Sequence, residues 1–256
     1  MTISAERIDV WCTYCDGIPD DLLTRYRALL TDAEREQAGR FHFAADRRRY
    51  LVTRALVRTM LSRYAPIAPD EWSFSTTPYG RPEIANDDRT ARTLSFSVSH
   101  TPGLIVLGLT HRQAIGIDIE NVRAGEAALD VADRFFAPAE VAALNALPAD
   151  RRRARFFDYW TLKESYIKAR GMGLSIPLDH VAFHFPDDGR VELSTSVQLH
   201  DDARRWRFWQ LRPSAGYLIA LCVERGGDAR PEVRTRSVIP FSREESLDCE
   251  ILRTSP

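Results

Sequence analysis

The residues best suited to chemistry lie in two short segments about forty positions apart. The first segment, Gly116–Glu120, contains Asp118 and Glu120, and the second contains Glu164 and Lys168. Three carboxylates and one ammonium, if the fold brings them together, could hold a hard divalent cation and neutralise the phosphates bound to it. The two segments therefore predict a magnesium-assisted phosphate site.

The two segments differ in the spacing of their apolar residues, which predicts a strand for the first and a helix for the second. Ile115, Ile117 and Ile119 alternate with small or polar residues, which predicts a strand. Side chains two apart on a strand share one face, about 7 Å apart along the chain. The isoleucines favour a buried strand, although the Asp-x-Glu pattern by itself is common on solvent-facing strands. Glu164 and Lys168 are four apart on a predicted helix and are therefore neighbours on one stripe.

The helix predicted over 151–170 contains the only two lysines of the chain, Lys163 and Lys168. Apolar residues occupy more than one of its faces, which indicates a largely buried helix. A buried Glu164 must then be paired, protonated or bound to a metal. The alternative is an ordinary solvated Glu–Lys pair worth about 0.3–0.5 kcal/mol. The acidic strand elsewhere in the chain favours the functional interpretation.

Polar residues at two turns are candidates for phosphate contacts. Ser99 and His100 follow the strand predicted at Leu94–Val98 and could donate hydrogen bonds to a phosphate, but an exposed polar turn explains them equally well. A Ser–His nucleophilic pair is disfavoured, because adjacent strand residues point apart and no G-x-S-x-G motif is present. Arg81, in the turn Thr77–Pro82, offers a rigidly placed guanidinium, with a solvated arginine as the alternative.

The overall charge argues against a nucleic-acid partner. The net charge is -1, whereas proteins that coat nucleic acid usually have a strong basic excess. The basic runs Arg47–Arg49 and Arg151–Arg155 are short and offset by nearby acids, so we interpret them as solvated faces. Part of the first run could still bind a phosphate-rich small ligand or an acidic protein.

Composition also bounds the location of the protein. No run of 18 apolar residues predicts a membrane span, and Met1–Arg7 has no apolar stretch typical of a signal peptide. Cys12 and Cys15 lack the second cysteine pair or nearby histidine that would complete a zinc site. We therefore expect a cytoplasmic protein with reduced thiols and no membrane partner.

The order of predicted elements suggests two similar halves. Helices are expected at Asp20–Leu30, Thr31–Ala38, Asp46–Tyr64, Ala127–Phe136, Ala139–Leu147 and Arg151–Arg170, and strands at Ile8–Tyr14, Trp72–Ser75, Leu94–Val98, Leu104–Leu109, Ile115–Ile119, Val181–Phe185, Val191–Ser194, Trp206–Leu211 and Leu218–Val223. This order predicts an α+β fold made of a pseudo-twofold pair of α/β halves, each a small antiparallel sheet packed on helices. We expect an N-terminal half at 1–112, a C-terminal half with the metal site at 113–225, and a tail at 226–256 with at most local structure.

Taken together, the motifs resemble those of the Sfp-type 4'-phosphopantetheinyl transferases. The resemblance is carried, in order, by Tyr79-Gly80-Arg81-Pro82, Phe96-Ser97-Val98-Ser99-His100, Gly116-Ile117-Asp118-Ile119-Glu120, Arg134-Phe135-Phe136 and Trp160-Thr161-Leu162-Lys163-Glu164-Ser165-Tyr166-Ile167-Lys168. It implies a pseudodimer of two halves in one chain, expected to be a monomer, with coenzyme A bound between them. It also implies that phosphopantetheine is moved from coenzyme A to a serine of an acyl or peptidyl carrier protein, releasing adenosine 3',5'-bisphosphate.

The resemblance further implies roles for individual residues. Asp118, Glu120 and Glu164 would ligate Mg²⁺ on the pyrophosphate, and Glu164 could also activate the carrier serine. The other implied contacts are Lys168, His100 and Ser99 at phosphate groups, Lys163 on the developing charge, and Tyr79, Gly80, Arg81 and Pro82 beside the adenine, with Arg81 on a phosphate.

The chain departs from the family pattern before Arg40-Phe41. Relatives often carry basic residues there that hold the 3'-phosphate, whereas this chain has Glu34 and Gln37. That role would pass to Arg40 or to the run Arg47–Arg49, with Arg47 as the candidate for binding coenzyme A.

Two other functions use the same residues. One is a magnesium-dependent pyrophosphate hydrolase, in which water is the acceptor. The other is a non-enzymatic module that binds a nucleotide or a carrier protein. The contact surface for a carrier protein is expected at Phe136, Phe156 and the run Arg151–Arg155.

Overall fold

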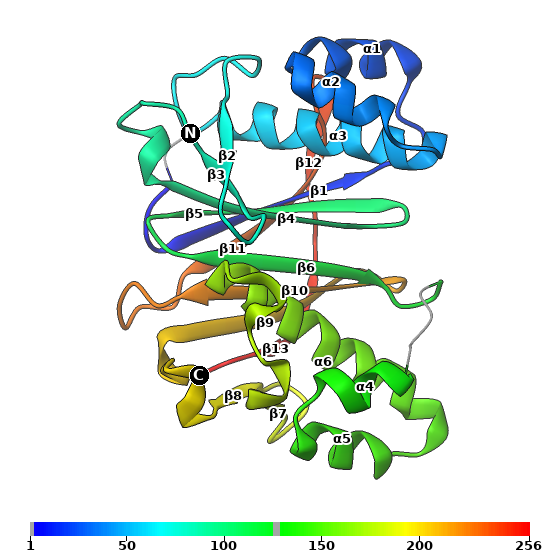
Figure 1. Cartoon of the computed structure of the whole chain (residues 1–256), viewed down its shortest axis with the longest axis vertical. Coiled ribbons are helices and arrows are strands. Elements are labelled where there is room, and N and C mark those ends of the chain that lie inside the picture. The colour runs from blue at the N-terminus through cyan, green and yellow to red at the C-terminus, as the bar shows by residue number, and fades with distance from the viewer. Residues whose placement is uncertain (1–2, 125–128) are drawn as a thin grey trace.

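The computed structural model describes residues 3–124 and 129–256. Two layers of helices enclose two sheets, with α1–α3 at one end of the molecule and α4–α6 at the other (Figure 1). The helices are α1 (Asp20–Ala28), α2 (Asp32–Gly39), α3 (Ala44–Leu61), α4 (Leu129–Phe135), α5 (Pro138–Asn145) and α6 (Ala149–Arg170). The strands are β1 (Arg7–Tyr14), β2 (Phe74–Thr76), β3 (Pro82–Ile84), β4 (Leu94–Thr101), β5 (Leu104–His111), β6 (Ile115–Asn121), β7 (Val181–His184), β8 (Glu192–Thr195), β9 (Trp206–Ser214), β10 (Tyr217–Glu224), β11 (Glu232–Ile239), β12 (Arg243–Ser246) and β13 (Glu250–Thr254).

The strands form two main sheets and two small hairpins. The first sheet has the order β12-β11-β1-β5-β4 and the second has the order β13-β9-β10-β6. The hairpins are β2-β3 and β7-β8. All pairs are antiparallel except β1 with β11, which are parallel and come from opposite ends of the chain.

Three hydrophobic cores hold these layers together. One lies between the first sheet and α1–α3, and a second packs α4–α6 against the second sheet. The third lies between the two sheets and joins residues such as Val10 and Val106 of the first to Ile117 and Ile219 of the second. Burial of β6 among these residues agrees with the alternating isoleucines of its sequence.

Local sequence signals explain where several helices begin and end. The Thr31 side chain accepts a hydrogen bond from the Glu34 backbone N–H, and the Glu34 carboxylate accepts one from the Thr31 N–H, so the predicted capping box is present at α2. Helix α6 ends at Gly171, whose φ of 68° lies in the left-handed region that favours glycine.

The predicted α+β class, with two halves that each pack a sheet on helices, is confirmed. The expected helices and strands are present with shifted ends, except that the first two residues of the helix predicted at Ala127–Phe136 fall outside the described residues. Strand β3 was not predicted, because Pro82 starts it and it has only three residues. The boundaries of the halves at 1–112 and 113–225 stay predictions.

The expectation for residues 226–256 is wrong. This segment forms β11 and β12 in the first sheet and β13 in the second. The sequence of this segment shows no regular spacing of apolar residues, because its strands are half-buried or lie at sheet edges. The strands are instead fixed by backbone pairing of β11 with β1 and of β13 with β9.

Two further features are the absence of a membrane-spanning helix among the described residues and the state of the cysteines. In the part of the chain that the structure describes, no helix has both the length and the apolar character needed to cross a bilayer. All four cysteines are free thiols. Burial raises the pKa of the Cys15 thiol to about 11.

Candidate active site

Helix α6 and strand β6 carry the acidic residues and lie directly against each other. Gly116 permits this contact, because a Cβ at this position would lie 1.9 Å from the Ser165 carbonyl oxygen and 2.4 Å from the Ala169 backbone nitrogen. With no side chain between helix and strand here, the α6 residues Glu164 and Lys168 reach the face of β6 that carries the other acids.

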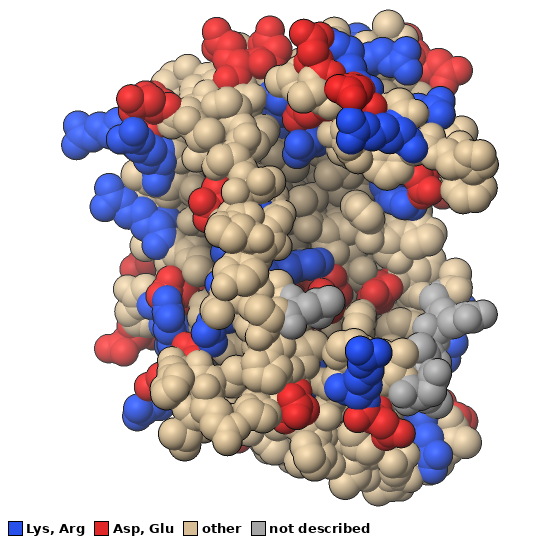
Figure 2. Space-filling model, in the orientation of Figure 1, with Lys and Arg blue, Asp and Glu red and all other residues tan. Residues whose placement is uncertain are grey.

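A cavity of about 420 Å³ opens where β4, β6, α3 and α6 meet. It is lined by Thr53, Val98, Ser99, His100, Asp118, Ile119, Glu120, Trp160, Glu164 and Lys168. We call this cavity the acidic pocket. Figure 2 shows basic and acidic side chains next to each other in a hollow near the middle of the molecule. The structure therefore brings together the residues predicted as metal ligands, together with Lys168, Ser99 and His100.

Asp118 is held in the acidic pocket by two hydrogen bonds to one of its oxygens. Its Oδ1 accepts hydrogen bonds from the Lys168 ammonium at 2.7 Å and from the Ser99 hydroxyl at 2.9 Å. Lys168 also donates to the Ser99 oxygen at 2.8 Å, which closes a triangle of contacts. The second oxygen, Oδ2, is buried and has no hydrogen-bond partner within the described ranges. A buried carboxylate oxygen without a partner is costly, so this atom is available to a ligand.

The ionised forms of the two other carboxyl groups of the acidic pocket, Glu120 and Glu164, are disfavoured by burial. Burial, with repulsion from the charge of Asp118, raises the pKa of Glu120 to about 7, although Trp160 and Lys168 partly oppose this. Burial also raises the pKa of Glu164, Asp118 adds to the effect, and Lys168 opposes it. A cation bound near these groups would oppose both shifts, because an opposite charge favours the ionised carboxylate.

The donor set of the acidic pocket fits a hard cation. Carboxylate oxygens are the ligands that Mg²⁺ prefers, and the unpartnered Oδ2 of Asp118 is such an oxygen. However, across residues 3–124 and 129–256 no three His, Cys, Asp or Glu side chains already form a group able to hold a metal. Mg²⁺ usually keeps several waters and substrate oxygens, so it needs only one or two protein carboxylates.

His100 lies at the same pocket, and its surroundings favour the neutral imidazole. Desolvation is the main cause that lowers the pKa of His100, and the positive charge of Arg49 adds to it. A neutral imidazole can still donate one hydrogen bond to a phosphate oxygen.

A second cavity of about 230 Å³ adjoins the acidic pocket. The predicted turn residues Tyr79, Gly80, Arg81 and Pro82 line it, and both cavities share Val98 and Lys168. The Arg81 guanidinium donates to the Ala169 carbonyl at the end of α6, at 3.0 Å. This contact brings the turn of the first half onto the last turn of α6.

The structure contradicts the role predicted for Lys163. Its ammonium is fully buried and pairs with the Glu140 carboxylate at 2.7 Å, away from the acidic pocket. It also donates to the carbonyl oxygens of Leu178 and Val181. Lys163 therefore ties α6 to α5 and β7 and is not available to a substrate.

Two other predictions are not supported by position. Arg47 lies outside both cavities, exposed at the start of α3, where it donates to the Phe41 carbonyl at 3.0 Å. Phe136 and Phe156 are 2% and 4% exposed, so they belong to the core of the second half and offer no contact surface.

Sequence reasoning missed three residues that help to build the site. Ser97 and Thr101 accept hydrogen bonds from the backbone N–H groups of Ile117 and Asn121, at 3.1 Å and 3.2 Å. With Ser99, they form a row of hydroxyls on one face of β4 that holds β6 in place. The alternation of hydroxyl residues at 97, 99 and 101 was the available signal. The third, Thr53, reaches the acidic pocket from α3 and had no signal in the sequence.

Comparisons with known proteins agree with this geometry. Residues 114–222 match the model of the 4'-phosphopantetheinyl transferase superfamily, and residues 19–111 match the model of the 4'-phosphopantetheinyl transferase N-terminal region. The two matches together cover β6 and α6 as well as the turn Tyr79–Pro82.

Curated relatives match over most of their own length. The chain is 33% identical to the 4'-phosphopantetheinyl transferase Sfp of Bacillus subtilis over 77% of this chain and 84% of that protein. It is 30% identical to the 4'-phosphopantetheinyl transferase HetI of a Nostoc species over 87% of this chain and 90% of that protein. The holo-[acyl-carrier-protein] synthase of Thermotoga maritima is a weaker structural match, with a TM-score of 0.36 and 24% identity over 45% of this chain and 66% of that one.

The two curated relatives are enzymes of one kind, and the superfamily match over residues 114–222 includes both the strand and the helix that form the acidic pocket. The chain belongs to the Sfp-type 4'-phosphopantetheinyl transferase family and is an enzyme of that class.

Proposed function

We propose that the enzyme transfers the 4'-phosphopantetheine group of coenzyme A to a serine of an acyl or peptidyl carrier protein, with Mg²⁺, and releases adenosine 3',5'-bisphosphate. The observation that carries this proposal is the acidic pocket, where the buried, unpartnered Oδ2 of Asp118 lies on a carboxylate that also contacts Lys168. The family of the chain supports phosphopantetheine as the transferred group.

Asp118, Glu120 and Glu164 are the residues that would hold Mg²⁺. When bound, the ion neutralises charge on the pyrophosphate and polarises its oxygens. The free Oδ2 suits this role, because Lys168 and Ser99 occupy only Oδ1 and keep the carboxylate from rotating. The raised pKa values of the two glutamates are consistent with a site that is completed by a cation.

Lys168 and His100 are suited to the phosphate oxygens. Lys168 lines both cavities, so its ammonium can contact a phosphate that lies between them without leaving Asp118. A positive group that is already oriented stabilises the charge that develops during transfer at phosphorus. The second cavity, lined by Tyr79–Pro82, would take the adenine end of coenzyme A.

The carrier serine needs a base within hydrogen-bond reach. Glu164 is the candidate, because it lines the acidic pocket together with Asp118 and Lys168, where the attacking serine would meet the pyrophosphate. In this proposal, the serine oxygen attacks phosphorus, the bond to the bisphosphate breaks, and the serine proton passes to Glu164 directly or through water.

Mass spectrometry of an apo-carrier protein provides the test. After incubation with the enzyme, coenzyme A and Mg²⁺, the carrier should gain one phosphopantetheine on a serine, and chelation of the metal with EDTA should prevent this gain. Asp118→Asn and Glu164→Ala should each lower the rate by orders of magnitude.

Two results would count against the proposal. Full activity of the Asp118→Asn variant would show that the acidic pocket is not the site of transfer. Rapid release of the bisphosphate from coenzyme A without any carrier would favour the pyrophosphate hydrolase instead.

A further inference from the structure

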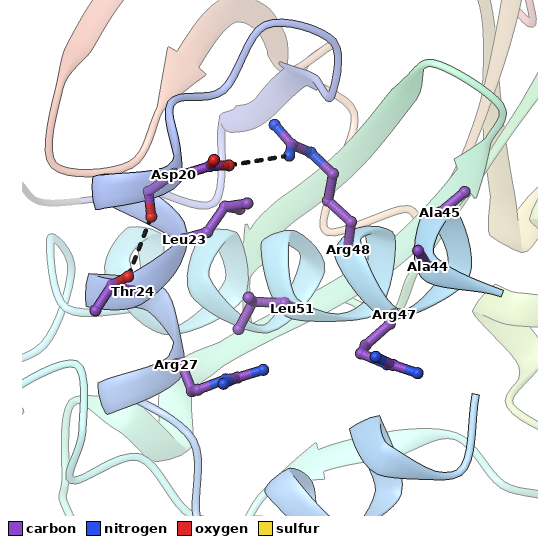
Figure 3. Close-up of a pocket in the computed structure, with 9 residues that line it drawn as sticks. All are labelled: Asp20, Leu23, Thr24, Arg27, Ala44, Ala45, Arg47, Arg48 and Leu51. Atoms are coloured by element: carbon purple, nitrogen blue, oxygen red, sulfur yellow. Dashed lines mark hydrogen bonds and ion pairs between the residues drawn. The ribbon is translucent and has the colours of Figure 1, made fainter. Parts of the chain in front are cut away.

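A groove on the first half of the protein lies outside the proposed active site. It has a volume of about 500 Å³ and runs between α1 and the start of α3. We call it the arginine groove and define it by Leu23, Arg27, Arg47, Arg48 and Leu51, which line it (Figure 3). A neighbouring hollow of about 400 Å³ shares Arg27, Arg47 and Leu51 and extends it toward α2.

Two guanidinium groups of the groove lack an acidic partner. Arg27 is exposed and has no side-chain hydrogen bond or ion pair with any residue that the structure describes, and Arg47 donates only to the Phe41 carbonyl. Both lie on the same side of Leu51 in Figure 3. Arg48, on the other side, lies 3.8 Å from the Asp20 carboxylate. The free positive charge of the groove is therefore concentrated at Arg27 and Arg47.

The floor between these charges is apolar. Leu51 is 8% exposed and Leu23 is half-buried, and Ala44 and Ala45 continue the lining. Phe43, immediately before α3, is 66% exposed. A free phosphate would use the arginines but not the apolar floor. A helix with one apolar face flanked by carboxylates would use both.

The groove is connected to the acidic pocket through α3. Ala45 and Arg48 also line a hollow that reaches Pro102 and Gly103, in the turn after His100. Arg47 and Thr53, six residues apart on this helix, leave it on different sides, so the hollow at Pro102 and Gly103 is the connection between the groove and the pocket. A protein that is bound in the groove and extends along this hollow would reach the turn beside His100 of the pocket.

We propose that the arginine groove docks an acidic amphipathic helix of the carrier protein. This inference rests on the proposed function, because it assigns the surface that receives the second substrate. Carboxylates of the helix pair with Arg27 and Arg47, and its apolar residues cover Leu23 and Leu51. Arg47, predicted from the sequence to bind coenzyme A, then serves the protein substrate instead.

The test compares a charge-reversal pair with a matched control. Arg27→Glu with Arg47→Glu reverses the two charges of the groove, and Arg89→Glu with Arg92→Glu makes the same change in net charge at two exposed positions just before β4. The KM values for apo-carrier and for coenzyme A are measured for each variant, together with binding of fluorescently labelled apo-carrier by anisotropy in the absence of coenzyme A.

The groove variant should raise the KM for the carrier and weaken carrier binding by about tenfold or more. Its kcat and its KM for coenzyme A should stay within about twofold of the wild type, and salt should weaken carrier binding less than in the wild type. The control variant should bind the carrier like the wild type.

Carrier binding by the groove variant that equals that of the wild type would overturn the inference. A rise in the KM for coenzyme A, with no change in the KM for the carrier, would also overturn it, because that result would place Arg47 in the coenzyme site. Failure of the proposed function is a separate result, seen as no phosphopantetheine transfer by the wild-type enzyme. The anisotropy measurement still decides whether the groove binds the carrier in that case.

Discussion

The two lysines of the chain have opposite surroundings although only five positions separate them. Five residues on an α-helix correspond to a rotation of about 140°, so the side chains leave α6 on different sides. Lys163 is buried with Glu140 in the second core, whereas Lys168 lies between the two cavities beside Asp118. One lysine therefore serves stability and the other serves the site.

Lys163→Met should lower the free energy of unfolding by about 3–5 kcal/mol, because it leaves the Glu140 carboxylate buried without its partner. Urea denaturation measures this change. Lys168→Met should lower the unfolding free energy by about 1–3 kcal/mol, because Asp118 stays buried but keeps the hydrogen bond from Ser99. The transfer rate should fall about 100-fold or more.

A double variant tests the physical reason for the first loss. Lys163→Met combined with Glu140→Gln removes both buried charges and keeps one acceptor oxygen for the backbone N–H groups of Ala137 and Phe183, so it should recover part of the lost stability. A double variant as unstable as Lys163→Met alone would mean that packing, and not the unpaired charge, causes the loss.

At the scale of elements, the contact between β6 and α6 sets the position of the acidic residues. Gly116→Ala would place a methyl group against the backbone of α6 at Ser165 and Ala169, which cannot move like a flexible side chain. We expect a loss of about 1–3 kcal/mol in the free energy of unfolding, because the contact would be overpacked. The transfer rate should fall as well, because the helix that carries Glu164 must shift away from Asp118.

Gly39→Ala is the matched control for this variant. No atom lies within 4 Å of a Cβ built at Gly39, and this residue lies in a helix, where alanine is the better former. Its stability should equal or slightly exceed that of the wild type. A Gly116→Ala variant with wild-type stability and rate would mean that the β6–α6 spacing does not control the site.

The row of hydroxyls on β4 holds the other edge of β6. Ser97→Ala should cost about 1–3 kcal/mol, because the buried backbone N–H of Ile117 loses its acceptor, and Thr101→Val should cost less, because Asn121 is only half-buried. Amide hydrogen exchange should show faster exchange at these two positions. Thr59→Val, in α3, is the control: its hydroxyl donates to helix carbonyls, and exchange in β6 should not change. Unchanged protection in β6 would argue against a holding role.

At the scale of the whole molecule, the last segment of the chain joins both sheets. Strand β11 lies beside β1, and β13 lies beside β9, as Figure 1 shows. Arg253 of β13 pairs with Asp158 of α6 at 3.1 Å and donates to Gln210 at 2.8 Å. The segment therefore ties the second half to the first.

Arg253→Met should lower the free energy of unfolding by about 1–3 kcal/mol, because the largely buried Asp158 would keep Arg155, at 3.4 Å, but lose its closer partner. Arg204→Met, which breaks an exposed pair with Asp202, should change it by less than about 1 kcal/mol. Thermal unfolding compares the two. Equal melting temperatures for both variants would contradict the structural role of β13.

The elements with a strong sequence period were predictable. In β6, isoleucines alternate with small or polar residues, and in α6, apolar residues recur with the helical period. Both patterns bury apolar side chains in one type of element only, so the type and position of these elements followed from the sequence. Strands β11–β13 have no such pattern, because few of their residues are fully buried. Strand β11 pairs with β1, 225 residues earlier at the pair Arg7 and Glu232, and β13 pairs with β9, 38 residues earlier at the pair Arg212 and Glu250. No local signal encodes either pairing.

The sequence by itself determined which residues share a face, because that depends only on the period of one strand or one helix. It therefore linked Asp118 to Glu120 and Glu164 to Lys168. Only the tertiary structure decided which groups meet across elements: Lys168 with Asp118, Lys163 with Glu140, and Arg47 with the α1–α3 groove. These contacts depend on the packing distance between elements, such as the approach that Gly116 permits, and a local pattern contains no information about that distance.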